Sequence, residues 1–252
     1  MATDMNAAAG SIAARCLALT GSFETGHLAP ECFATATGNF DGQGMSFGAL
    51  QWNFGQGTLQ PMLGEMLANH PELVASIFGP DVESLKKALK DGKAASLAFA
   101  SAIQEAGKKT LLAVWSKRFR ALGLTPEFQA IEIKAAAAYY ERAVRLSAEY
   151  GLWTARGRAL MFDLCVQNGG IPDPVKRQIL ADIAMLPAGL SPEETELQKM
   201  RIIANRRAEA ANPKFVEDVR KRKLCIAEGK GSVHGIAYDL SAQFGIDLRK
   251  AD

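Results

Sequence analysis

The stretch from residue 17 to residue 59 constrains this fold most, because a helical pattern there gives way to a glycine-dense loop. Apolar residues recur before and into this stretch at roughly helical spacing: Ile12, Cys16, Leu19 and Phe23. This spacing predicts a helix with one apolar face. Thr25-Gly26 then predicts the helix end, because glycine readily adopts the positive φ common after a helix. Strand signal is confined to about 36–53, so we expect one small β element directly after this helix.

The remaining chain follows helical periodicity with stops at glycine or proline. Ser191-Pro192-Glu193-Glu194 is a strong helix start, with serine as N-cap and glutamate three residues later. We expect further N-caps at Thr58, Asp81 and Thr154. Thr125-Pro126 should open the longest helix, ending at Gly151.

We expect that longest helix to be central and buried, because Ala135–Ala138 would let a neighbouring helix approach closely. The tail from Gly231 to Leu248 is interpreted as a turn plus one short helix. The sequence therefore predicts a mainly α fold (α+β) of about ten helices, in a single domain spanning residues 1–252 with a cleft beside the β element.

Composition excludes several classes of protein. Hydrophobic content of 48% supports a sizeable core, and 22% charged residues with a net charge of +2 argue against a disordered or nucleic-acid-coating protein. The chain has no run of 18 apolar residues, so we expect no membrane span. Its first residues lack the layout of a secretory signal. An external substrate would then require delivery from the cytoplasm by another system, such as a lysis pore, a secretion machine or a phage particle.

Charge is distributed unevenly. Residues 1–80 contain six acids and one base, whereas residues 86–120 contain nine bases and two acids. The acidic segment would suit a cationic sugar polymer, and the basic segment an anionic one such as a cell wall. The alternative is that both are ordinary solvated helix faces.

Cysteines and histidines show no metal-binding spacing, so neither a metal nor a cofactor is implied. The residues are Cys16, Cys32, Cys165, Cys225, His27, His70 and His234. Free buried thiols are expected, with a Cys16–Cys32 bridge as the alternative in an oxidising compartment.

Two carboxyl groups in the constraining stretch are candidates for acid and base. Glu24 ends the apolar helix, and partial desolvation there would suit a general acid. Asp41 lies among glycines that would leave amides and water around its charged form. Environments that differ in this way divide acid and base roles, a pattern for which lysozyme is the standard example. The alternative, if each residue is considered alone, is that Glu24 is a solvated residue at a helix end and Asp41 is an ordinary turn residue.

These residues resemble the chitosanase-like branch of the lysozyme superfamily, the family 46 glycoside hydrolases and their peptidoglycan-active bacterial and phage relatives. Glu24 matches the acid that ends the first long helix, and Asp41-Gly42-Gln43-Gly44-Met45-Ser46 matches the D-G-x-G-x-[ST] loop. The segment from Phe162 to Gly170 and the tail from Arg206 to Gly235 also look similar. The resemblance implies a lysozyme-like fold of two lobes with a substrate cleft between them.

By that resemblance, Glu24 would protonate the leaving oxygen, Asp41 would act as base toward water, and Ser46 would position that water. The family more often has threonine at the last position. Six side chains are candidate substrate contacts: His27, Gln43, Gln51, Asn53, Asp163 and Gln167. Trp52, between Gln51 and Asn53, would then face the core. Asp163 and Gln167 share one helix face, and the alternative to a cleft contact is a buried polar network with the backbone of the loop.

The leading hypothesis is a lysozyme-like hydrolase of β-1,4 links between amino sugars in peptidoglycan. A chitosanase is the first rival, and a non-catalytic wall-binding module is the second. The polysaccharide is the expected partner, without nucleic acid. Any immunity protein or delivery partner stays unspecified.

Overall fold

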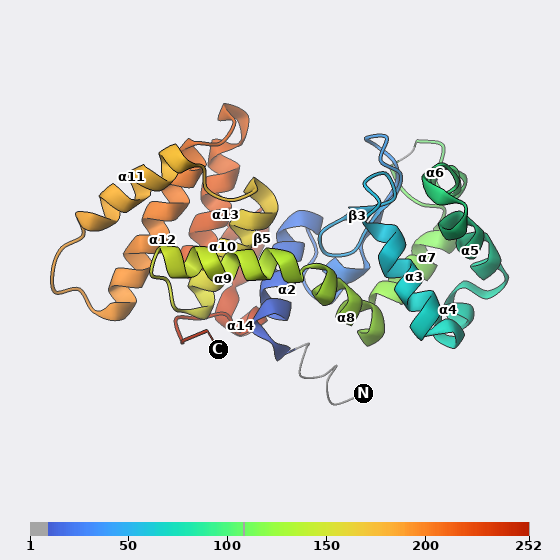
Figure 1. Ribbon diagram of the computed structural model, residues 1–252, viewed down its shortest axis with the longest axis horizontal. Coiled ribbons are helices and arrows are strands. Elements are labelled where there is room, and N and C mark those ends of the chain that lie inside the picture. The colour runs from blue at the N-terminus through green and yellow to red at the C-terminus, as the bar shows by residue number, and fades with distance from the viewer. Residues whose placement is uncertain (1–9, 108, 252) are drawn as a thin grey trace. The chain divides into compact units, whose positions relative to one another are not determined.

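A computed structural model describes residues 10–107 and 109–251 of the chain (Figure 1). The N-terminal residues that bear on secretion, and Lys108 of the basic segment, lie outside this described part. The chain forms two compact units. Unit 1 contains Glu24–Ala136, and unit 2 contains Ser11–Phe23 together with Ala137–Asp252. No helix in the described part is long and apolar enough to cross a membrane.

Unit 1 is helical apart from one small sheet. Its elements are η1 (Glu31–Ala34), β1 (Ala36–Thr37), β2 (Ser46–Phe47), β3 (Trp52–Asn53), α3 (Leu59–Asn69), α4 (Pro71–Phe78), η2 (Gly79–Asp81), α5 (Val82–Lys90), α6 (Gly92–Ala102), α7 (Ala113–Gly123) and α8 (Pro126–Ala135). The strands pair antiparallel in the order β1-β2-β3, with Ser46 opposite both Thr37 and Asn53. This confirms the strand signal predicted between residues 36 and 53.

Aromatic packing joins this sheet to the helices of unit 1. The Phe47 ring of β2 lies 5.1 Å from the rings of both Phe119 on α7 and Phe128 on α8. Phe119 in turn meets Phe78 of α4, with ring centroids 5.4 Å apart. All four rings are fully buried, so the short strands are held by a shared apolar core rather than by their few hydrogen bonds.

Unit 2 is a helical assembly with one hairpin. Its elements are α2 (Ile12–Thr25, whose last two residues belong to unit 1), α9 (Ala137–Glu149), α10 (Ala155–Asn168), α11 (Asp173–Ala184), α12 (Pro192–Glu209), η3 (Pro213–Phe215), α13 (Val216–Glu228), β4 (Lys230–Val233), β5 (Ile236–Asp239) and α14 (Leu240–Phe244). Within this unit α12 packs along α13, and α9 packs along α10 (Figure 1). Most residues of α10 are buried, which makes α10 the central helix of the unit.

The prediction of one long buried helix from Thr125 to Gly151 is wrong. The helix breaks at Ala136 into α8 and α9, and the chain passes there from unit 1 to unit 2. Only Ala143 and Ser147 of α9 are buried, because charged and tyrosine side chains occupy most of its circumference. The alanine run marks the break between two helices instead of a close helix contact.

The tail also differs from its prediction. Residues 230–239 form the antiparallel hairpin of β4 and β5, where a turn alone was expected. Val233 pairs with Ile236, and the two turn residues, His234 and Gly235, have φ of 50° and 82°. Two consecutive positive φ values match the right-handed twist of a tight hairpin. The His-Gly pair between apolar residues was the overlooked signal.

Helix caps divide into confirmed and wrong predictions. Ser191 and Glu194 form the predicted capping box, and Thr154 accepts a hydrogen bond from the Gly157 amide at 3.0 Å. Thr58 does not cap α3, because its hydroxyl bonds to the backbone of Asn53. Asp81 does not cap α5 but pairs with Arg118.

All four cysteines are buried, as predicted. Cys16, Cys165 and Cys225 are free thiols. Burial raises the pKa of the Cys16 and Cys225 thiols to about 12. These two thiols therefore remain protonated at neutral pH and act as small apolar side chains.

Candidate functional site

Glu24 lies in the last turn of α2, where the sequence predicted it. The preceding Phe23 is 2% exposed and anchors the helix end in the core of unit 2. Gly26 has φ of 71° and ends the helix. The Glu24 side chain itself is exposed. The sequence analysis expected this carboxyl group to be partly buried, and the exposed side chain does not show that burial.

Asp41 lies in the loop between β1 and β2, and its side chain is exposed. Its Oδ1 accepts a hydrogen bond from the Gln43 amide at 3.0 Å, which closes a tight local turn. Gly42 and Gly44 have φ of 86° and 80°, so this turn requires glycine on either side of Gln43. No cation of the described residues forms an ion pair with Asp41. The carboxylate is open to solvent and to a ligand.

Hydrogen bonds hold this loop at several points. The Asn39 side-chain oxygen accepts from the Gly44 amide at 3.1 Å, which bridges the loop across Asp41. The Asn39 amide donates to Oε1 of Gln104 at 2.8 Å. At the far side, the Gly55 amide donates to the Gln43 carbonyl at 2.7 Å, and a Cβ at Gly55 would lie 2.4 Å from the Gln43 side chain. The loop is thus braced by residues well outside it.

Ser46 opens β2 and is only 6% exposed. Its place in the central strand follows from its pairing with Thr37 and Asn53. Its role in positioning water stays a prediction.

Gln51 and Asn53 serve the local backbone. Gln51, with φ of 54°, accepts from the Thr37 hydroxyl at 3.1 Å and donates to the Gly48 carbonyl at 2.9 Å. Asn53 is 6% exposed, and its side-chain oxygen accepts from the Gln56 amide at 2.8 Å. These bonds hold both side chains against nearby residues of the sheet and its turns, and their contacts with sugar stay predictions. Trp52, 8% exposed, faces the core as expected.

His27 and Gln43 are the two remaining substrate-contact candidates of unit 1. His27 is exposed three residues after Glu24, and its amide donates to the Thr25 hydroxyl at 3.2 Å. Gln43 is half-buried two residues after Asp41. Their contacts with substrate stay predictions.

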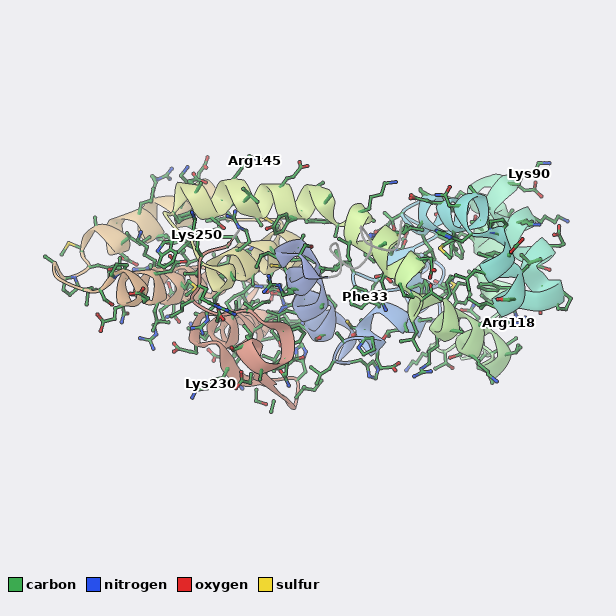
Figure 2. All side chains as sticks on the ribbon, turned by 90° about the horizontal axis from the view of Figure 1, so that it is seen from below. Phe33, Lys90, Arg118, Arg145, Lys230 and Lys250 are labelled. Carbon is green, nitrogen blue, oxygen red and sulfur yellow. The ribbon has the colours of Figure 1, made fainter. Side chains whose placement is uncertain are left out.

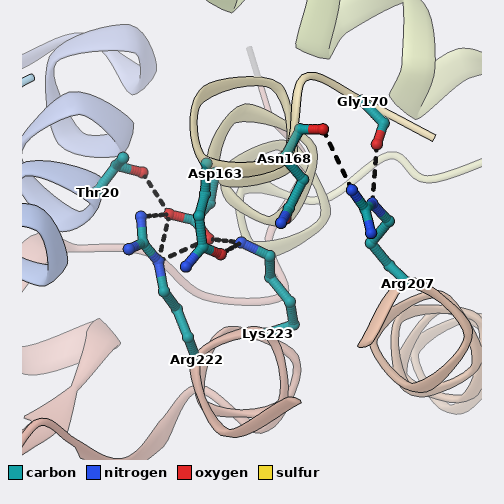
Figure 3. Close-up of polar contacts among 8 residues, drawn as sticks. Thr20, Asp163, Asn168, Gly170, Arg207, Arg222 and Lys223 are labelled. Atoms are coloured by element: carbon teal, nitrogen blue, oxygen red, sulfur yellow. Dashed lines mark hydrogen bonds and ion pairs between the residues drawn. The ribbon is translucent and has the colours of Figure 1, made fainter. Parts of the chain in front are cut away.

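Asp163 lies at the centre of a buried charge cluster in unit 2 (Figure 3). It has no exposed surface, and its Oδ1 accepts from Nη2 of Arg222 at 2.6 Å. Lys223 pairs with its other oxygen and also donates to Oε1 of Gln167 at 2.6 Å. The Thr20 hydroxyl of α2 donates to Oδ1 at 3.1 Å. Burial alone would raise the pKa of Asp163, but Arg222 and Lys223 outweigh it and lower this pKa to about 2.

The prediction that Asp163 contacts substrate is wrong, because a side chain without exposed surface cannot reach a sugar. The alternative of a buried polar network is the one observed, and Gln167 belongs to it through Lys223. Its partners are side chains of α2 and α13 instead of the loop backbone. Arg222 and Lys223 were missed. The sequence feature that could have identified them is helical spacing: they follow Val219 by three and four residues, so they lie on the same buried face of α13.

Glu132 is a second residue that the sequence analysis missed. It lies on α8, has no exposed surface, and accepts from the Ala49 amide at 2.7 Å. Its Oε1 is buried without a hydrogen-bond partner. Burial raises the pKa of Glu132 well above its usual value, although the bond from Ala49 opposes this. Gly48 is required opposite it, since a Cβ there would lie 2.7 Å from the carboxyl group.

Within the described part of the chain, no three His, Cys, Asp or Glu side chains gather as a metal site would require.

Solved structures to which this chain is similar include chitosanases. The chain aligns with the GH46 chitosanase of Gynuella sunshinyii in complex with chitotetraose at a TM-score of 0.52 and 14% identity, over 88% of this chain and 94% of that one. It aligns with the native chitosanase of Bacillus subtilis MY002 at a TM-score of 0.51 and 20% identity, over 90% of this chain and 94% of that one. No family model and no curated protein matches the sequence.

These likenesses confirm the predicted fold. The chain has a mainly α fold like that of these chitosanases. At these identities the similarity establishes the fold alone, because one fold can carry many chemistries.

Proposed function

We propose that this protein is a glycoside hydrolase that cleaves β-1,4 links between amino sugars, with Glu24 as general acid and Asp41 as general base. The observation that carries the proposal is Asp41 itself: an exposed carboxylate without a cationic partner among the described residues, on a braced loop 17 residues after Glu24. Both carboxyl groups belong to unit 1. The chitosanase-like fold supports this assignment by analogy.

The proposed reaction uses the two groups in opposite senses. The Glu24 carboxylic acid donates its proton to the glycosidic oxygen as the bond from that oxygen to the anomeric carbon breaks. Asp41 accepts a proton from the water whose oxygen bonds to the same carbon. A bound sugar chain would supply the enclosure that exposed Glu24 lacks, because excluding water strengthens the charge interactions.

Peptidoglycan is the substrate that we propose first. Three exposed lysines, Lys87, Lys90 and Lys93, lie where α5 meets α6, and none pairs with a carboxylate among the described residues. Figure 2 labels Lys90 on this part of the chain. Leu97 and Ala100 of α6 lie against Gly44 of the Asp41 loop, so α6 connects this basic surface to the loop. Such cations would attract an anionic wall polymer and repel protonated glucosamine chains.

Chitosan is the second candidate substrate. It is favoured by a specific observation: the solved structures reported above are chitosanases, one of them in complex with chitotetraose. A chitosanase would use Glu24 and Asp41 in the same roles, so the two candidates differ only in the polymer that the protein binds.

Digestion of both polymers tests the proposal. The protein is incubated with purified sacculi and, separately, with chitosan, and soluble fragments are analysed by mass spectrometry. Fragments with reducing-end muramic acid support the peptidoglycan hydrolase, and glucosamine oligomers support the chitosanase. Release of neither, with the protein still sedimenting together with sacculi, would contradict hydrolysis and favour a wall-binding module.

A further inference from the structure

We propose that Gln104 is a positioning residue for Asp41: its side-chain oxygen fixes the loop that presents the carboxylate. This inference rests on the proposed function, because Asp41 is assigned there as the base. Gln104 follows α6 in the connector to α7, far from Asp41 in the sequence. It touches no substrate in this proposal and acts through Asn39.

Two hydrogen bonds in series carry the proposal. Oε1 of Gln104 accepts from the Asn39 amide at 2.8 Å, and Oδ1 of Asn39 accepts from the Gly44 amide at 3.1 Å. Asp41 lies between Asn39 and Gly44, so these two residues are the ends of the turn that carries it. Fixing Asn39 therefore fixes the direction in which the turn leaves β1.

Gln104 is itself held rigidly, which an anchor requires. Its backbone forms an antiparallel bridge with Leu111, and the Leu112 amide donates to the Ile103 carbonyl at 2.9 Å. Ile103 and Leu111 are 3% and 5% exposed, so the base of this connector is packed into the core of unit 1. The connector also accepts from the Gly38 amide, through the Lys109 carbonyl at 3.0 Å.

The loop cannot supply this anchor by itself. Gly42 and Gly44 both adopt positive φ, and glycines give a turn the greatest conformational freedom of any residue. The local bond from the Gln43 amide to Asp41 fixes the carboxylate relative to its own turn but not the turn relative to the sheet. The Gln104 bond provides that second restraint where the turn leaves β1, together with the Lys109 carbonyl, while the bond from the Gly55 amide to the Gln43 carbonyl holds the other side of the turn.

The test compares three variants in the full-length protein. Gln104→Ala removes the acceptor, Gln104→Glu keeps an acceptor at the same place, and Gln129→Ala is the matched control. Gln129 is also half-buried in unit 1, and its side chain also makes one backbone bond, to the Gly123 carbonyl at 3.1 Å. Activity is measured on sacculi or chitosan, whichever polymer the parent protein digests.

For Gln104→Ala we expect kcat to fall about 10-fold to 100-fold with KM within about twofold, because a small misplacement of a reacting group slows chemistry more than binding. Gln104→Glu should restore kcat to within about threefold of the parent, since a carboxylate accepts from an amide as the glutamine oxygen does. Gln129→Ala should keep the parent kcat. Equal kcat for Gln104→Ala and the parent, or equal losses in Gln104→Ala and Gln129→Ala, would overturn the inference.

Amide hydrogen exchange gives a readout that does not depend on turnover. Exchange at Asn39 and Gly44 should accelerate in Gln104→Ala and not in Gln129→Ala, because only the first variant releases the loop. Unchanged exchange there overturns the anchoring itself. If the parent digests neither polymer while exchange accelerates as expected, the anchoring holds and the proposed function fails, and the positioning role fails with it.

Discussion

Asp163 shows how a single residue can look like a substrate contact and serve the core instead. Its i, i+4 relation to Gln167 correctly placed two polar side chains on one helix face. The sequence could not reveal the counter-ions, because Arg222 and Lys223 follow 59 and 60 residues later in the chain. A buried carboxylate needs such partners, and only the packing of α10 against α13 brings them to it.

Replacing Asp163 with asparagine should destabilise the protein by about 3–5 kcal/mol, because two buried cations would lose their counter-charge. Asp182→Asn is the matched control. Asp182 pairs with Arg206 through two bonds but its side chain is 35% exposed, so solvent screens the pair and the loss there should be much smaller. Urea denaturation measures both. Equal losses would show that the Asp163 cluster contributes no more than a surface pair.

Glu132 should make stability depend on pH in the opposite sense from a paired acid. Its pKa is raised in the folded state, so the folded protein binds more protons than the unfolded chain above the usual value of 4.5. The free energy of unfolding should therefore fall as pH rises from 4.5 toward the raised pKa, and be insensitive to this group below 4.5. Glu132→Gln should flatten that dependence in denaturation curves across pH. A dependence that survives the substitution would assign it to other groups.

Secondary-structure elements followed the sequence where the signal was local. The helix end at Glu24, a small β element between residues 36 and 53 and the Ser191 capping box were predictable, because glycines, alternation and cap residues act over a few positions. The break at Ala136 was not, since alanine favours helix on both sides and only tertiary packing interrupts it. Some glycines are also required because a segment remote in the sequence packs closely against them, and the sequence does not identify that segment.

Gly123, the last residue of α7, is such a glycine. A Cβ there would lie 2.4 Å from the Phe33 carbonyl oxygen and 2.5 Å from Cα of Ala34, both backbone atoms of η1. Gly123→Ala should therefore destabilise the protein by at least about 1–3 kcal/mol through overpacking. Gly64→Ala is the control, because Gly64 lies within α3 with nothing within 4 Å of its added Cβ. It should stabilise by about 0.5–1 kcal/mol. Thermal unfolding measures both variants, and a neutral Gly123→Ala would contradict the packing of α7 on η1.

The chain forms two compact units, and it passes from one to the other after Gly10, after Phe23 and after Ala136. The sequence predicted the mainly α architecture and the chitosanase-like fold, because helix patterning extends along the chain and the acid and loop motifs lie close together in it. That the two units form a single catalytic domain stays a prediction. For the candidate site, the sequence predicted that Glu24 ends a helix and that Asp41 lies in a glycine-rich loop. The bracing by Asn39 and Gln104 was not, since it depends on contacts between distant segments.

Turnover by single carboxyl variants tests the central claim most directly. Reducing ends released from sacculi and from chitosan are counted for the parent, Glu24→Gln, Asp41→Asn, and the controls Glu72→Gln and Asp173→Asn, which change exposed acids of α4 and α11. Both site variants should lower kcat by at least about 100-fold, because each removes a proton-transfer group, while polymer binding and unfolding temperature stay at parent values. The controls should retain parent activity. If either Glu24→Gln or Asp41→Asn releases reducing ends as fast as the parent, that residue does not perform the proposed chemistry.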